Sequence, residues 1–341
     1  MKKKISIVLM MVLAAVSLFA VPNNRNAAAT VNLIRNTVIT NADLNSQMQM
    51  LGASEEQALD VLDIMINDEV FLQGAERDGV TVTDAQVDAL YAQQKNAYEQ
   101  QAGAAMTDEQ FEQIVNQAYG SVDAYKETIR NQYILQTYLM QEKGDELNNG
   151  NYAPAASDVE TFYKRNATSF TQAENVKFAQ IYMAKTGEAD QDAQKLATMQ
   201  RVASDIKSGK LTFEAAVNQY TEDEESKADG GVMGWLSSDN NVVRQLWGDD
   251  FVDTVLSLPL GATSDVIESL TGYHIVKVTV HNDARLLGID DRIQPDVAYT
   301  VRDYISEYLA QVNMQNAMNQ ALNDMVETLR SEARIRVIYS N

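Results

Sequence analysis

The sequence has 341 residues, of which 45% are hydrophobic and 22% are charged, and its formal net charge is −21. This length allows two or three globular domains, and the acidic balance excludes nucleic acid as a partner, because phosphate binding requires clustered Lys and Arg. The absence of cysteine excludes thiol catalysis and cysteine-based zinc sites, and two histidines are too few for a His-rich metal site. We therefore expect no metal and no cofactor.

The first twenty residues have the pattern of a secretory signal peptide. Three lysines at residues 2–4 precede an uncharged apolar stretch over residues 5–19, and Ala20 offers a small residue for cleavage. The apolar stretch is shorter than the ~20 residues that span a bilayer. We expect cleavage after Ala20, which removes three lysines and takes the net charge from −21 to −24. The mature chain is then exported, periplasmic or extracytoplasmic, and meets the membrane only transiently through its signal peptide.

A strand followed by helices is expected over residues 21–150. The β-branched residues 31–40 predict a short strand or hairpin, and Asn41 is expected to cap a helix that runs to about Leu51. Later helices are expected after capping boxes headed by Ser54, Thr83 and Thr107, and a further helix is expected from about Ser121. The helix after Ser54 is expected to bury an apolar stripe of Leu59, Leu62, Ile66 and Val70.

A stretch rich in Asn, Gly and Pro, residues 148–156, predicts a linker, and Ser157 is expected to head a further capping box for a helix that reaches Tyr163. The pattern then predicts a compact α+β domain. Strands are expected at its two ends, near residues 176–182 and 273–280. Between them, three helical stripes are expected over residues 191–208, 213–220 and 251–256.

The last part of the sequence predicts one long amphipathic helix over residues 298–330 and a final strand over residues 335–338. Strands at the two ends of the chain are each unstable alone, so we expect them to pair. Such a pair would join both chain ends into one discontinuous domain, with residues 176–283 inserted.

An ordered set of motifs lies between residues 213 and 278. It comprises Phe213-Glu-Ala-Ala, Tyr220-Thr-Glu-Asp223, Gly230-Gly-Val-Met-Gly-Trp235, Phe251 to Leu258 and Gly272-Tyr-His-Ile-Val-Lys277. In this order the motifs resemble the parvulin family of peptidyl-prolyl isomerases. With the flanking helices and signal pattern, the chain resembles the exported SurA/PrsA-type foldases and chaperones.

The resemblance implies an α+β fold, in which a parvulin domain is inserted in a mainly helical chaperone domain formed by both chain ends. The parvulin domain would contain a four-stranded antiparallel sheet with helices around it. The expected divisions are a signal peptide (1–20), an N-terminal helical chaperone segment (21–150), a linker with a short helix (151–172), the parvulin-type domain (173–284) and a C-terminal helix and strand (285–341).

The resemblance also implies a set of catalytic residues. Asp223 would lie near the substrate carbonyl, and His274 would be the histidine of the last strand. Gln180 stands where parvulins usually carry a first-strand histidine; it can keep a hydrogen bond to His274 but cannot titrate. The substrate-binding residues implied by the same matches are Met233 and Phe251 as walls of a proline pocket, Trp247 or Leu246 as a further wall, and Thr271 just before His274.

Simpler interpretations of these residues remain open. His274 could be a structural histidine of the strand, and Asp223 could belong to a solvated acidic loop with its neighbours. Met233 and Phe251 could be ordinary core residues.

Two functions from different classes follow from the resemblance. The first is a prolyl isomerase that acts on unfolded exported polypeptides containing proline. The second is an ATP-independent holdase whose parvulin module is catalytically weak or inactive, because Gln180 replaces the usual histidine. Neither function uses ATP, since the sequence has no nucleotide-binding Gly-rich loop.

Overall fold

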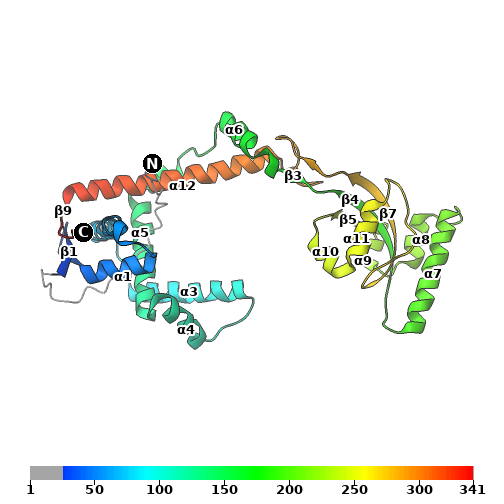
Figure 1. The fold of residues 1–341 in the computed structure, drawn as a ribbon, viewed down its shortest axis with the longest axis horizontal. Helices are drawn as coiled ribbons and strands as arrows, with labels where there is room; N and C mark the ends of the chain where they lie inside the picture. Colours follow the sequence, from blue (N-terminus) through cyan, green and yellow to red (C-terminus); the bar gives the residue numbers. More distant parts are fainter. Residues whose placement is uncertain (1–25, 341) are drawn as a thin grey trace. The chain divides into compact units, whose positions relative to one another are not determined.

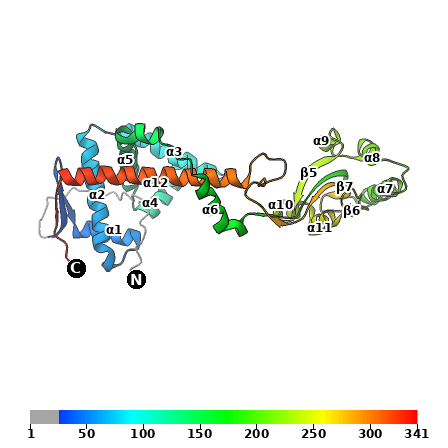
Figure 2. The ribbon, with the colours of Figure 1, turned by 90° about the horizontal axis from the view of Figure 1, so that it is seen from above.

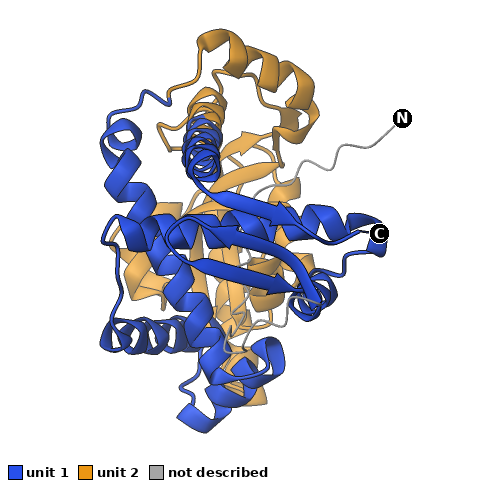
Figure 3. Ribbon diagram, turned by 90° about the vertical axis from the view of Figure 1, so that its left-hand side faces the viewer, with its two compact units in different colours: residues 1–152, 310–341 blue, residues 153–309 orange. Residues whose placement is uncertain are grey.

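The structure is a computed structural model that describes residues 26–340. The expected signal peptide, residues 1–20, lies outside the described residues. The chain divides into two compact units (Figure 3): residues 1–152 with 310–341 form unit 1, and residues 153–309 form unit 2. Within residues 26–340, none of the helices combines the length and the apolar character needed to cross a membrane.

Unit 1 contains a three-stranded antiparallel sheet that joins distant parts of the chain (Figure 1). Strand β1 (Ala27–Asn32) lies between β2 (Asn36–Thr40) and β9 (Arg334–Val337). In this register Thr30 pairs with Arg336. The predicted pairing of the N-terminal and C-terminal strands is therefore confirmed.

Helices form the rest of unit 1. They are α1 (Asn41–Leu51), η2 (Glu55–Gln57), α2 (Ala58–Arg77), α3 (Asp84–Ala102), α4 (Asp108–Tyr119), α5 (Val122–Asn148) and the part of α12 (Val301–Glu332) that follows residue 309. The core gathers around α2, whose Leu62, Ile66 and Val70 are buried in one apolar cluster with side chains of α5 and α12. Helices α2 and α12 approach so closely at Gly74 that a Cβ atom added there would lie 2.6 Å from Leu329 Cδ2.

Side-chain caps begin these helices largely as the sequence predicts. Capping boxes headed by Ser54, Thr83 and Thr107 are all present. At α1 the predicted cap is wrong by one residue: Thr40 caps the helix, and Asn41 is its first residue. Thr40 has an extended backbone, and its hydroxyl oxygen accepts a hydrogen bond from the Asp43 N–H, as a capping side chain must.

Two further sequence predictions are wrong. Leu59 is 47% exposed, because the buried face of α2 runs through Ala58 and Leu62. Ser157 heads no capping box, since α6 (Ala156–Asn166) begins before it and takes its first hydrogen bonds at the Ala155 carbonyl. With its backbone already helical, Ser157 cannot occupy the N-cap position.

The main sheet of unit 2 has four antiparallel strands in the order β5-β4-β7-β6. The α+β class and the four-stranded antiparallel sheet implied by the resemblance are confirmed. The four strands are β4 (Asn175–Ala184), β5 (Val232–Ser237), β6 (Ile267–Glu268) and β7 (Gly272–Asn282). Hydrophobic pattern alone predicts only the two central ones, β4 and β7.

Helices cover both faces of this sheet (Figure 2). They are α7 (Ala189–Lys207), α8 (Phe213–Tyr220), α9 (Glu224–Lys227), α10 (Asn241–Trp247) and α11 (Asp249–Ser257). On one face Val176 and Phe178 of β4 pack in a cluster with α11, whereas on the other face Ala179 and Ile181 pack in a cluster with α7 and α8. The alternation along β4 thus assigns Gln180 to the α11 face.

A smaller part of unit 2 lies beyond this sheet. Strand β3 (Thr171–Gln172) pairs with β8 (Arg285–Leu286), and the short helix η3 (Ala167–Ser169) precedes β3. Val159 of α6 forms an apolar cluster with the first turns of α12, represented by Val301. The domain limits drawn from the sequence at residues 173 and 284 stay a prediction.

Candidate active site

A fully buried histidine lies at the centre of the site. His274 of β7 is 0% exposed, and both of its ring nitrogens are hydrogen-bonded. Nδ1 lies 2.8 Å from Gln180 Oε1 on β4, and Nε2 lies 2.8 Å from Ser269 Oγ. The predicted contact between Gln180 and His274 is therefore present, and Gln180 is itself only 2% exposed.

Ser269 is a member of the site that sequence reasoning missed. Its hydroxyl oxygen accepts the backbone N–H groups of Thr271, at 3.1 Å, and Gly272, at 3.0 Å. It therefore ties the turn before β7 to His274. A serine before a Gly-containing turn is common, so the only available signal was its position five residues before the histidine.

Aromatic rings surround the imidazole. Ring centroids of Phe251, Tyr182 and Trp247 lie 4.6, 4.8 and 5.6 Å from that of His274. Phe251 is fully buried, and the Tyr182 hydroxyl donates to the Thr271 carbonyl at 3.0 Å. Burial, assisted by the positive charge of Lys185, lowers the His274 pKa to about 3, so the ring is neutral near pH 7.

Met233 of β5 completes the cluster. Its sulfur accepts a hydrogen bond of 3.1 Å from Gln180 Nε2, and its side chain packs on the apolar cluster that contains Phe251. Close contact between β4 and the segment before β5 depends on Gly231: a Cβ atom there would lie 2.4 Å from the Gln180 carbonyl oxygen, and its φ is +82°. Glycine is the residue that tolerates both conditions.

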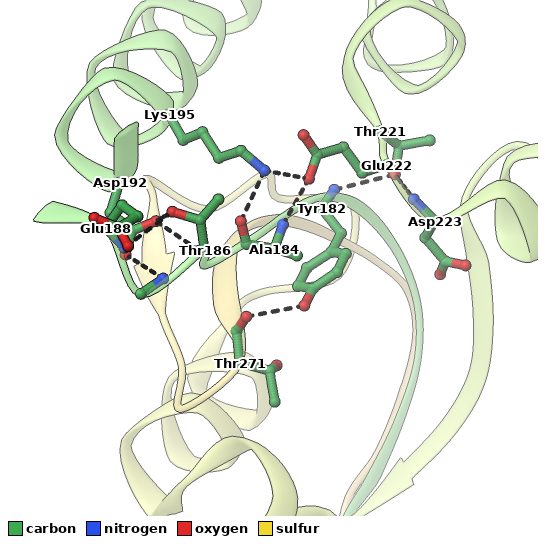
Figure 4. Close-up of polar contacts among 11 residues, drawn as sticks. Tyr182, Ala184, Thr186, Glu188, Asp192, Lys195, Thr221, Glu222, Asp223 and Thr271 are labelled. Carbon is green, nitrogen blue, oxygen red and sulfur yellow. Dashed lines mark hydrogen bonds and ion pairs between the residues drawn. The ribbon is translucent and has the colours of Figure 1, made fainter. Parts of the chain in front are cut away.

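Asp223 lies on a neighbouring segment, at the start of α9. Its carboxylate caps α9, accepting from the Ser226 N–H at 3.4 Å and from the Ser226 hydroxyl at 2.7 Å. Thr221 connects this segment to β4 (Figure 4), because its Oγ1 accepts from Tyr182 N at 3.2 Å and from Asp223 N at 3.4 Å. Asp223 is thus tethered to the strand that carries Gln180.

Side chains of α7 and of the segment after α8 bind the end of β4 and the loop that follows it (Figure 4). Glu222 accepts from Ala184 N at 2.9 Å and from Lys195 Nζ at 2.7 Å, and the same Nζ donates to the Ala184 carbonyl. Asp192 accepts from the Thr186 N–H at 2.7 Å. These contacts fix the end of β4 beside Tyr182.

The other two sequence-derived residues have different positions. Leu246 is 53% exposed and lies outside the apolar cluster that includes its neighbour Trp247. Thr271 is half-buried, and its main chain takes part in the site through Tyr182 and Ser269. In residues 26–340 no group of three or more Asp, Glu or His side chains could hold a metal ion.

The site therefore combines apolar walls with a short chain of fixed hydrogen bonds. Its one serine–histidine contact, between Ser269 and His274, joins two buried side chains and presents no nucleophile to a bound peptide. This inventory suits a reaction that needs a shaped, dry surface, not a covalent intermediate.

Comparisons with known proteins agree with this inventory. Residues 178–280 match the family described as the PPIC-type PPIase domain, and residues 1–139 match the SurA-like N-terminal domain. Two similar relatives are the proteins named Chaperone SurA of Salmonella choleraesuis, 33% identical over 108 residues, and of Escherichia coli O6:H1, 32% identical over 108 residues. In both, the match covers 32% of this chain and 23% of the relative, so it spans less than a quarter of their length.

Solved structures give looser likenesses. A SurA-like chaperone of Campylobacter jejuni is 16% identical, with 92% of this chain and 100% of that chain covered and a TM-score of 0.38. PrsA of Bacillus anthracis is 19% identical, with 77% and 96% covered and a TM-score of 0.29. The chain therefore combines a SurA-like N-terminal domain, matched by residues 1–139, with a PPIC-type PPIase domain, matched by residues 178–280.

Proposed function

We propose that the chain is an exported folding factor that binds unfolded proteins and isomerises their Xaa-Pro peptide bonds. The observation that carries this proposal is the buried cluster around His274, inside the stretch that matches the PPIC-type PPIase domain. Rotation about a peptide bond faces a barrier of about 18–20 kcal/mol, and uncatalysed Xaa-Pro exchange takes tens of seconds. A site that removes the amide carbonyl from water and grips the proline ring lowers this barrier without covalent chemistry.

In this proposal Met233 and Trp247, which are partly exposed, form walls against which the proline ring packs, and Phe251, which is fully buried, supports them from behind. Asp223 faces the substrate carbonyl from the segment tethered to β4, and Leu246 and Thr271 border the bound peptide. His274 and Gln180 are too buried to touch the substrate, so we assign them the task of holding the walls and the turn at Ser269 in place. Unfolded, proline-containing polypeptides are the partners, and neither ATP nor nucleic acid takes part.

The proposal extends to location and domain limits. A signal peptide over residues 1–20 would deliver the chain to the periplasm or another extracytoplasmic space. The parvulin-type domain would occupy residues 173–284. The chaperone domain would combine residues 21–150 with 285–341, and residues 151–172 would link the two.

A protease-free isomerisation assay on the mature full-length chain tests the enzyme proposal. We expect Trp247→Ala and Asp223→Ala each to lower kcat/KM at least ten-fold. Trp235→Ala is the matched control, because this second tryptophan lies on β5 and donates its indole N–H to Asp296, away from His274. If the wild-type chain gave no rate above the uncatalysed exchange, the enzyme proposal would be abandoned.

An ATP-independent holdase is the second candidate. Two observations favour it: Gln180 cannot titrate, and unit 1 leaves large apolar side chains exposed, such as Met50 at 55% and Met140 at 40%. Flexible methionine side chains adapt to varied partners. The full chain should then suppress aggregation of an unfolded client, and Trp247→Ala should suppress it equally well. Failure of the wild-type chain to protect the client would remove this candidate.

A further inference from the structure

A chain of hydrogen bonds joins Ser269, His274, Gln180 and Met233. Ser269, at one end of this chain, determines which atom donates in each bond. A hydroxyl group has two acceptor lone pairs and one hydrogen. The backbone N–H groups of Thr271 and Gly272 occupy both lone pairs of Ser269 Oγ, at 3.1 and 3.0 Å. The hydroxyl hydrogen is then left to donate. His274 Nε2 is its nearest acceptor at 2.8 Å, and Thr271 Oγ1 and the Gly272 carbonyl oxygen lie farther away, both at 3.2 Å. A proton on Nε2 would bring a third donor to an oxygen whose two lone pairs are already occupied, so we infer that Nε2 carries no proton.

Met233 sets the same direction from the opposite end. The Gln180 side chain bridges His274 Nδ1, 2.8 Å from Oε1, and Met233 Sδ, 3.1 Å from Nε2. A thioether sulfur has no hydrogen and can only accept. If the amide were reversed, its oxygen would face the sulfur and that hydrogen bond would be lost. The amide NH₂ therefore faces Met233, and Oε1 requires a proton on Nδ1.

We propose that Met233 is a positioning residue that, through Gln180, holds His274 as the neutral imidazole with its proton on Nδ1. Ser269 at one end and Met233 at the other both require the tautomer with the proton on Nδ1, so the two ends of the hydrogen-bond chain agree. Given the proposed isomerase function, the consequence for catalysis is a site whose hydrogen bonds do not rearrange with pH. A second histidine at position 180 would allow two tautomers and could titrate, whereas the Gln180 amide does neither.

The surroundings of His274 also oppose its protonation. The rings of Tyr182, Trp247 and Phe251 exclude water from it, and Ile267 of β6 pairs with it in the sheet. The charged group that acts on the imidazole is Lys185. Its Nζ donates to the Ser269 carbonyl at 2.9 Å and lies 2.7 Å from Glu268, so the cation is held beside the site.

Nitrogen-15 NMR of the full-length, substrate-free protein labelled at histidine tests the assignment. The chain has two histidines, so His281→Gln leaves the His274 signals alone. We expect a protonated Nδ1 and an unprotonated Nε2, both unchanged from pH 5 to pH 9. A proton on Nε2, or a signal that titrates within this range, would overturn the proposal.

Two variants test the part played by each neighbour. Met233→Leu keeps the size of the side chain and removes the acceptor, so we expect Gln180 to reverse in part and a fraction of at least one tenth of the Nε2-protonated tautomer to appear. Gln180→Glu places a carboxylate at Nδ1, so His274 should now titrate between pH 5 and pH 9. A wild-type spectrum for Met233→Leu would contradict the role of the sulfur. If this variant did not fold, the Gln180→Glu and wild-type spectra would still decide between the two tautomers.

An isomerisation assay from pH 5.5 to pH 8.5 separates this inference from the function on which its catalytic meaning rests. We expect a flat profile of kcat/KM for the wild-type chain and a sloping one for Gln180→Glu. A wild-type profile that sloped would contradict the pH-insensitive site. Absence of any isomerase rate would remove the proposed function, and the NMR spectra would still establish or refute the tautomer.

Discussion

Among single residues, His274 couples the protonation of unit 2 most directly to its folding. In the native protein it stays neutral down to a pKa of about 3, whereas an unfolded histidine takes up its proton near 6.5. Between these two pH values the unfolded state binds more protons, so stability falls as the pH falls. Above pH 6.5 both states are neutral and the histidine adds no pH dependence.

We therefore predict that unit 2 loses about 2–3 kcal/mol of unfolding free energy between pH 7 and pH 4.5 through this residue alone. Urea unfolding followed by tryptophan fluorescence would measure it. His274→Gln should be less stable at pH 7 but lack this part of the pH dependence. Equal slopes for wild type and His274→Gln would refute the assignment.

Asp68 on α2 makes the stability of unit 1 depend on pH in the opposite sense to His274 in unit 2. Burial, with the neighbouring charge of Glu69, raises the pKa of Asp68 to about 7, and its Oδ1 is buried without a hydrogen-bond partner. The native carboxyl group keeps its proton up to pH 7, whereas the unfolded one loses it near pH 4. The native state therefore binds more protons in this range, and stability falls as the pH rises.

Replacement of Asp68 by a neutral asparagine should remove this loss of stability at higher pH. We predict that Asp68→Asn becomes more stable than wild type as the pH rises from 5 to 8, by a final difference of about 2–4 kcal/mol. Far-UV circular dichroism in urea would report it, because unit 1 is mainly helical. Asp60→Asn, which removes a charge on the exposed face of the same helix, should show no such growth with pH. A constant difference for Asp68→Asn would show that its charge is not the cause.

Residue-level prediction from the sequence was partial for physical reasons. The contact between Gln180 and His274 could be predicted, because two strands of one sheet bring alternating positions onto one face. Ser269 could not, since a turn hydroxyl has no periodic signature. Leu246 and Trp247 are adjacent and both apolar, but a short helix buries only one of them, and only tertiary packing decides which.

At the scale of elements, the contact between α2 and α12 depends on a missing side chain. A Cβ atom at Gly74 would lie 2.6 and 2.8 Å from the two methyl groups of Leu329, which is itself 2% exposed. Alanine is favoured over glycine inside a helix by about 1 kcal/mol. Here we expect the overlap to outweigh that preference, because the Leu329 side chain is packed within the apolar core of unit 1.

We predict that Gly74→Ala destabilises unit 1 by about 1–3 kcal/mol in urea unfolding. The double variant Gly74→Ala with Leu329→Ala should be less destabilised than the sum of the two single changes. Gly144→Ala in α5 is the matched control. Its Cβ atom would meet no atom closer than Met140 Cε at 3.4 Å, so this change should be neutral or stabilising. Strict additivity of Gly74 and Leu329 would contradict the direct contact.

Elements differed in how well the sequence predicts them. Helices headed by capping boxes at Thr83 and Thr107 could be located closely, because a cap is a local interaction. Strand β5 was not found by pattern, since Gly230, Gly231 and Gly234 interrupt the alternation that marks a strand. Its existence depends on hydrogen bonds to β4, which are not local.

At the scale of the whole molecule, two spectroscopic signals report on the two units to different extents. Tryptophan fluorescence reports on unit 2, which contains both Trp235 and Trp247. Far-UV circular dichroism reports mainly on unit 1, which contains most of the helical residues in the described part of the chain. Strand β9 belongs to unit 1: Ile335 packs on the unit 1 core, and just after the strand Ile338 N donates to the Ala28 carbonyl at 2.8 Å.

We predict that a chain shortened to end at Ala333 loses stability in unit 1 only. The far-UV circular dichroism transition should move to lower urea, since β1 loses its central position and the core loses Ile335. The fluorescence transition of unit 2 should keep its midpoint. A parallel shift of both transitions would mean that the two units unfold together.

The pairing of β1 with β9 has a consequence for the order of events when the chain is delivered from its N-terminus. Unit 2 is one uninterrupted stretch, whereas β9 follows its partner β1 by about 300 residues. Closing so long a loop is entropically costly, and it cannot begin before β9 arrives. Until then one edge of β1 stays open to other strands. Unit 2 can therefore be complete and ready to bind while the unit whose chain began first is still waiting for its last strand.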